Sequence, residues 1–208
     1  MNDYSIVEEK LNIYSHLLGL LLSFVGFILL VFKALEDYDV SISASFIIFG
    51  MSLILLYLSS VLYHATDDVE RRFRHKVYDH CAIYILIAGT YTPFTIGAIG
   101  GQLGWVIFSV TWVFAIIGII LKVFFTGRFK VISTLMYVFM GWMIVFFIKP
   151  LTLTLLDEGF NLLLAGGISY TVGALIYTIK KLKLNHAIFH LFVLAGSICH
   201  YLSVYLYI

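Results

Sequence analysis

The sequence has few charged residues, few prolines and few cysteines. Charged residues make up 12% of the 208 positions, whereas 62% are hydrophobic, which is too apolar a composition for a soluble globular protein. The only two cysteines are Cys81 and Cys199. We expect Cys81 to open one helix and Cys199 to lie roughly 20 Å along another, so they form no disulfide framework. The net charge of +1 gives no indication of a nucleic-acid partner.

Apolar runs of membrane-spanning length account for most of the chain. A transmembrane helix needs about 17 to 25 mainly apolar residues, and seven runs meet this criterion. No linker rich in proline or serine separates them, which predicts one all-α, seven-helix transmembrane domain over residues 1–208. We place the helices near Ile13–Phe32, Ser43–His64, Tyr78–Ile99, Leu103–Phe125, Val131–Ile148, Leu162–Ile179 and Asn185–Tyr207.

Lysine and arginine are distributed unevenly over the predicted helix ends. One set of ends carries 11 of the 13 basic residues, and the other carries only Lys33 and Lys149. Because basic residues are retained on the cytoplasmic side, we expect the N-terminus inside and the C-terminus outside. The segment 1–9 is acidic and leads into a run of spanning length, so we expect no cleaved signal peptide. The 11 residues are Lys10, Arg71, Arg72, Arg74, Lys76, Lys122, Arg128, Lys130, Lys180, Lys181 and Lys183.

Several ionisable residues lie within or at the ends of these runs, where each is costly and is therefore a candidate for a functional site. The predicted orientation brings His64, Asp79 and His186 to one depth, because the second helix ends where the third and seventh begin. His186 and His190 are four residues apart, so both rings project from one helix face. Ser60 has the same spacing from His64. The full set is His16, His64, Asp79, His80, His186, His190 and His200.

Three imidazoles and a carboxylate at one depth favour a metal site. Neutral imidazole suits zinc, and three protein ligands with a water in the fourth position are typical of a catalytic zinc site. His64, His186 and His190 would then be the ligands. Asp79 would hold or deprotonate the water, and Ser60 would orient the water or a ligand. The same histidines could instead make hydrogen bonds between helices or lie among lipid headgroups.

Two further histidines are interpreted as structural. His200 lies ten residues beyond His190, about 15 Å deeper, so the two cannot readily share an ion. We interpret His200 as a packing or lipid-pocket group. His16 lies near the predicted start of the first helix, where Asn12 could be the N-cap. This position favours a role in helix packing and capping.

Five segments in fixed order are more specific than any single motif. They are Glu9–His16, Ser60–His64, Tyr78–His80, Gly89–Phe94 and His186–His190. Together they resemble the hemolysin III family, the bacterial branch related to the progestin and adipoQ receptors, including adiponectin receptors, and more distantly to alkaline ceramidases. The resemblance covers nearly the whole chain. It implies a seven-helix protein of the bacterial cytoplasmic membrane with an inside N-terminus and an intramembrane zinc.

The resemblance also implies a role for each candidate residue. The family's zinc-binding histidines fall on His64, His186 and His190, its aspartate near the metal-bound water on Asp79, and its serine on Ser60. Every one of these positions is filled in this sequence.

Three functions remain open on the sequence. Resemblance to the receptors and ceramidases suggests a zinc-dependent hydrolase of a membrane-lipid amide or ester, with the lipid entering between helices. The hemolysin name suggests a cytolytic or pore-forming protein, but a pore should show polar residues along several helices, whereas here they gather at one end. The third function is a sensor or receptor with structural zinc. No sequence feature names the lipid.

Overall fold

The computed structural model describes residues 4–36, 38–125 and 130–208, and their side chains apart from those of 130–132. Within these ranges the chain is all helical and has no strand, as predicted. Arg128 and residues 1–3 lie outside the described residues. The elements are α1 (Ile6–Ala34), α2 (Val40–Ala65), α3 (Val69–Pro93), η1 (Phe94–Ile99), α4 (Gly101–Phe125), α5 (Lys130–Trp142), η2 (Met143–Phe147), α6 (Ile148–Thr152), α7 (Asp157–Thr178) and α8 (Asn185–Tyr207).

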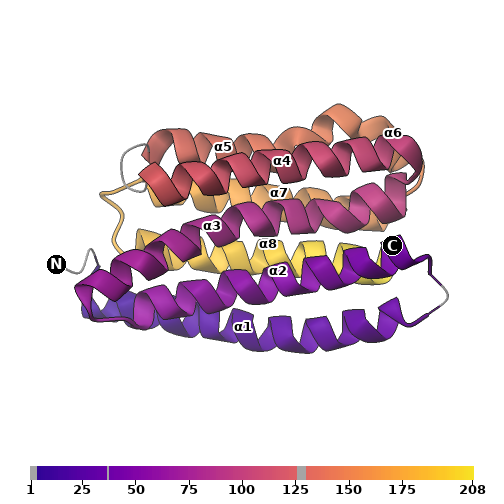
Figure 1. The fold of residues 1–208 in the computed structure, drawn as a ribbon. Helices are drawn as coiled ribbons and strands as arrows, with labels where there is room; N and C mark the ends of the chain where they lie inside the picture. The colour runs from indigo at the N-terminus through magenta and orange to yellow at the C-terminus, as the bar shows by residue number, and fades with distance from the viewer. Residues whose placement is uncertain (1–3, 37, 126–129) are drawn as a thin grey trace.

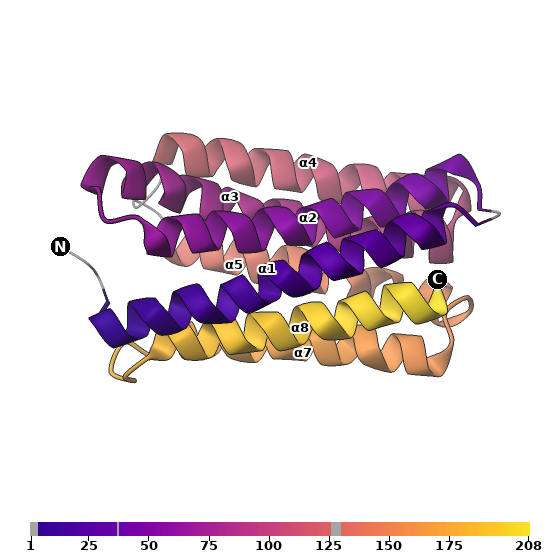
Figure 2. The ribbon, with the colours of Figure 1, turned by 90° about the horizontal axis from the view of Figure 1, so that it is seen from below.

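Seven helical segments among the described residues are long and apolar enough to cross a membrane, which confirms the predicted number. Two of them combine consecutive elements: α3 continues into η1, and α5, η2 and α6 together form the fifth span. The helices lie roughly along one common axis, and successive spans cross the bundle in opposite directions (Figure 1). The two termini lie at opposite ends of the bundle, as an odd number of crossings requires (Figures 1 and 2).

The metal-binding candidates depend on how four helices pack. α8 lies between α7 and α1, and α2 lies between α1 and α3 (Figure 2). The main cluster of buried side chains is built largely from α2, with contributions from α1, α3 and α8. One end of the bundle carries the start of α1, the 66–68 turn and the 179–184 loop (Figure 1). We call it the basic end, because the basic-rich helix ends lie there.

Two helices begin at least seven residues earlier than hydropathy predicts. α3 starts at Val69 instead of Tyr78, because Asp68 caps it by accepting a hydrogen bond from the Arg71 backbone N–H at 2.8 Å. α1 starts at Ile6 instead of Ile13, with Ser5 as its N-cap. The interpretation of Asn12 as the N-cap is therefore wrong. A search for apolar runs does not detect a polar first turn of a helix. The N-cap residues Ser5 and Asp68 nevertheless indicate where α1 and α3 begin.

The fifth span is broken in the middle by a side chain. The Tyr91 hydroxyl donates to the Gly141 carbonyl at 3.1 Å and accepts from the Ile144 N–H at 2.7 Å. These backbone groups are thereby diverted from the regular helical ladder, and the chain tightens into the 3-10 segment η2.

The orientation in the membrane is testable with reporter fusions. The turn between α2 and α3 is short, so the insertion point is between Asp67 and Asp68. A reporter active only outside the cytoplasm should work after Ile208 and fail at this turn, because the basic residues hold that end inside. Activity in the turn together with silence after Ile208 would show the opposite orientation.

Candidate metal centre

Three histidines meet at the basic end. Each of His64, His186 and His190 offers a ring nitrogen, and these atoms lie within 4.8 Å of one another. The Nε2 atoms of His64 and His186 are 3.1 Å apart. All three side chains are buried. Three nitrogens this close, from residues far apart in the sequence, could hold one metal ion.

Local structure explains why these rings meet. His64 occupies the last turn of α2, which runs toward the basic end, and His186 and His190 occupy the first two turns of α8, which runs away from it. Asn185 fixes the start of α8 by donating its side-chain N–H to the Tyr177 carbonyl, at the end of α7, at 3.0 Å. The i, i+4 spacing then places both α8 rings on one face of that helix, directed toward His64.

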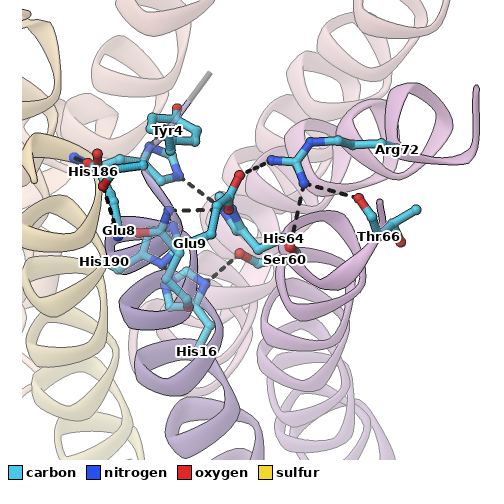
Figure 3. A network of polar contacts seen from close by, with 12 residues as sticks. Tyr4, Glu8, Glu9, His16, Ser60, His64, Thr66, Arg72, His186 and His190 are labelled. Atoms are coloured by element: carbon cyan, nitrogen blue, oxygen red, sulfur yellow. Dashed lines mark hydrogen bonds and ion pairs between the residues drawn. The ribbon is translucent and has the colours of Figure 1, made fainter. Parts of the chain in front are cut away.

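The first helix and Tyr4, which directly precedes its N-cap, contact the Nδ1 atoms of these histidines. His64 Nδ1 donates to Glu9 Oε2 at 2.7 Å, and His190 Nδ1 donates to the Asn12 carbonyl at 3.3 Å. His186 Nδ1 lies 3.2 Å from the Tyr4 hydroxyl (Figure 3). A ring whose Nδ1–H is held by an oxygen presents a bare Nε2 to an ion. The tautomers implied by these contacts therefore direct all three Nε2 atoms to the shared point.

Glu9 is itself held by a cation. Arg72 in the first turn of α3 pairs with Glu9 Oε1 and also donates to the Thr66 carbonyl at 3.1 Å (Figure 3). Glu8 accepts a hydrogen bond from the His186 backbone N–H at 3.2 Å. This N–H lies in the first turn of α8 and therefore has no acceptor within the helix. α1 thus joins α2, α3 and α8 around the three histidines.

Ser60 and Asp79 lie beside the group and not within it. The Ser60 hydroxyl is buried, lies beside the Asp79 side chain, and lies 2.7 Å from His16 Nδ1. Asp79 is not among the residues whose ligand atoms converge. Ser60 on the neighbouring helix therefore lies between Asp79 and His16, whose ring stacks on that of His190.

Sequence reasoning missed part of this site. His16 does not cap a helix, because its ring stacks on that of His190 with centroids 3.5 Å apart. Glu9, Asn12 and His16 follow the spacing of one helix face, which could have marked α1 as part of the site. The spacing of residues could not have identified Arg72, because the sequence predicted a loop there, between the second and third helices. His200 is remote from the group and donates from Nε2 to the Leu163 carbonyl at 3.0 Å.

Comparison with known proteins identifies the family. The family model described as Haemolysin-III related matches residues 4–201. The chain belongs to this family. It is 45% identical over 203 residues to Hemolysin-3 of Bacillus cereus, covering 98% of this chain and 93% of that protein. It is 42% identical to the Hemolysin-3 homolog of Bacillus subtilis (strain 168), covering 98% and 96%.

A more distant relative is human. The Monocyte to macrophage differentiation factor of Homo sapiens is 26% identical over 213 residues, covering 97% of this chain and 84% of that protein. With seven apolar helices and two bacterial relatives, this haemolysin III-related chain is a multi-pass bacterial membrane protein.

Alanine variants test the ligand set of this haemolysin III-related protein. Replacing His64, His186 or His190 singly with alanine should abolish stoichiometric metal binding, because two imidazoles remain. His200→Ala should retain the metal. Elemental analysis of the purified variants decides the matter, and undiminished metal in His186→Ala and His190→Ala would falsify the set.

A second variant tests the contact from α1. Glu9→Gln keeps the shape of the side chain but removes the charge that holds His64 Nδ1–H, so metal affinity should fall by about 10–100-fold. Glu70→Gln is the matched control, because Glu70 is exposed and pairs only with Arg74 on its own helix. Competition with a chromophoric chelator measures both affinities. Equal affinities for the two variants would contradict a role for Glu9.

Proposed function

We propose that the protein is a zinc-dependent intramembrane hydrolase that cleaves an amide or ester bond of a membrane lipid. One observation carries the proposal: three buried imidazoles converge, and no fourth ligand from the described part of the chain belongs to the group. Asp79 on α3, beside Ser60, offers a carboxylate to this site. A structural zinc site normally closes its coordination with four protein ligands, whereas a catalytic site keeps one position open.

The donor set fits zinc. The three candidate ligands are imidazole nitrogens, which suit zinc, and no cysteine belongs to the group. Bound zinc would supply a Lewis acid that polarises a carbonyl and lowers the pKa of water toward about 7. His64, His186 and His190 would hold the ion. The oxygen atoms of Tyr4, Glu9 and Asn12 that contact their Nδ1 atoms would orient the three rings.

Asp79 and Ser60 would carry the remaining chemistry. Asp79 would position the attacking water and accept its proton, which general bases at hydrogen-bonding distance do with about 10²–10⁴-fold effect on rate. Ser60 would orient Asp79, since the two side chains lie side by side. His16 would fix the Ser60 hydroxyl from the opposite side, through the 2.7 Å contact at Nδ1.

A lipid substrate fits the surroundings of the site. A hollow of about 150 Å³ lies between α2 and α3, and its lining is mainly apolar, consisting of Leu55, Leu58, Ser59, Leu62, His75 and Tyr78. Tyr78 and Asp79 are consecutive in α3, so an acyl chain in this hollow would lie along the helix that carries the carboxylate, on the face that Tyr78 occupies. The related receptors and ceramidases suggested by the sequence motifs support the same substrate class.

A cytolytic function is the second candidate, favoured by the names of the two Bacillus relatives. A sensor with structural zinc is the third. Ion flux in liposomes that persists after removal of the metal would support the cytolytic function over the hydrolase.

Lipid turnover tests the hydrolase directly. Purified protein with retained metal should release free fatty acid from some member of a panel of lipid amides and esters. Asp79→Asn should lower the rate by about 10²–10⁴-fold while metal content stays unchanged. Asp157→Asn, an exposed residue at the opposite end of the bundle, should keep full activity.

Two results would contradict the hydrolase. If no lipid in a broad panel is cleaved by the metal-loaded protein, the reaction is absent. If Asp79→Asn changes only thermal stability or ligand binding, the sensor replaces the hydrolase.

A further inference from the structure

A second polar cluster lies in the middle of the bundle, among helices whose sequence looks apolar. It consists of Tyr57 on α2, Tyr170 on α7, and Ser197 and His200 on α8, and we call it the mid-helix cluster. Tyr57 lies seven residues before His64, and Ser197 lies seven residues after His190. At 1.5 Å per residue, the cluster is about 10 Å from the three histidines, away from the basic end.

The members of the cluster contact one another. Tyr170 and Ser197 share a hydrogen bond of 2.8 Å between their hydroxyl oxygens, and the Tyr170 ring meets the His200 ring edge to face at 5.3 Å. The Tyr57 side chain lies beside Ser197 and Tyr170. Tyr57, Ser197 and His200 are buried, and Tyr170 is partly buried.

Two buried polar atoms of this cluster have no protein partner. Among the described residues, nothing lies in hydrogen-bonding geometry with the Tyr57 hydroxyl or with His200 Nδ1. His16 Nε2 is in the same situation, and its ring meets the Tyr57 ring edge to face at 5.1 Å. Most buried polar atoms in native proteins are hydrogen-bonded to protein or to ordered water. Buried polar atoms without a protein partner therefore indicate places where ordered water can bind.

The backbone is shaped around these side chains. The Tyr57 ring packs on Gly19 of α1, and the His200 ring packs on Gly166 of α7, so closely that a Cβ at either glycine would overlap the ring. The polar rings are therefore enclosed by fitted helix surfaces and do not reach the lipid. Their unpartnered atoms are buried within the bundle.

We propose that the mid-helix cluster binds ordered water, which hydrogen-bonds to the Tyr57 hydroxyl and to His200 Nδ1. The Tyr170–Ser197 pair supplies further donors and acceptors, so that such a water finds the two to four partners that a buried water needs. The polar interior then extends from the three histidines to the middle of the bundle. This site is independent of the metal and of the proposed hydrolase.

Radiolytic footprinting of the metal-loaded protein in lipid nanodiscs tests the proposal. Radicals formed from bound water oxidise the side chains beside it, so Tyr57 and His200 should be labelled severalfold faster than Phe46 and Phe49. These phenylalanines are fully buried on the same helix as Tyr57 and have no polar atom. Labelling in ¹⁸O water identifies solvent as the source of the oxygen. Tyr57 labelling as slow as that of Phe46 and Phe49 would overturn the proposal.

The variant Tyr57→Phe gives an independent result. If water bridges the cluster, loss of the hydroxyl should lower the thermal midpoint and reduce His200 labelling. If the hydroxyl is truly unpartnered, its removal should leave the midpoint unchanged or raise it, because no hydrogen bond is lost. Tyr14→Phe is the control, since Tyr14 is exposed on α1.

A raised or unchanged midpoint in Tyr57→Phe would refute the water site. A lowered midpoint with undiminished His200 labelling would also refute it, because the loss would then come from packing alone. Metal content measured on the same samples should equal that of the wild type. The water site can therefore fail while the metal centre stands, and the reverse also holds.

Discussion

Hydrogen bonds that join the Nδ1 atoms of three histidines to α1, and to Tyr4 just before it, are the constraint on which the site depends. A buried imidazole N–H without an acceptor is costly, and Glu9, the Asn12 carbonyl and Tyr4 provide acceptors for His64, His190 and His186. These contacts select the tautomer with a bare Nε2 and fix the rotation of each ring. A buried Glu9 carboxylate would itself be costly without a cation, and Arg72 meets that need because α3 begins before the apolar run.

Much of the fold was predictable because the membrane limits the possibilities. Only helices of spanning length satisfy the backbone in lipid, so apolar runs gave seven spans. Helix direction and the 3.6-residue period then brought His64, His186 and His190 to one end and one face. The break in the fifth span was not predictable, since it comes from the Tyr91 hydroxyl on another helix. The place of His16 against His190 was also missed, because it depends on which helices are neighbours.

The distribution of buried polar groups favours an enclosed site over a pore. The sequence indicated polar residues mainly at one end, with His200 alone deeper, and the structure adds Tyr57, Tyr170 and Ser197 beside His200 in the middle of the bundle. Within the spans, histidine and aspartate stand out in the sequence as ionisable residues, whereas tyrosine and serine, apart from Ser60, do not. The structure shows that these two residue types contribute buried polar atoms, because neighbouring helices enclose them. The Tyr57 and His200 rings sit against glycine surfaces of the bundle interior, so this polar region does not require a channel through the protein.

The central claim is that three histidines, oriented by α1, bind one zinc ion and leave a coordination position open. X-ray absorption spectroscopy at the zinc edge of the purified protein tests this most directly. The account predicts three imidazole rings, recognised by their multiple scattering, with nitrogen at about 2.0–2.1 Å and one further oxygen neighbour. Fewer than three imidazoles, or a sulfur neighbour at about 2.3 Å, would contradict it.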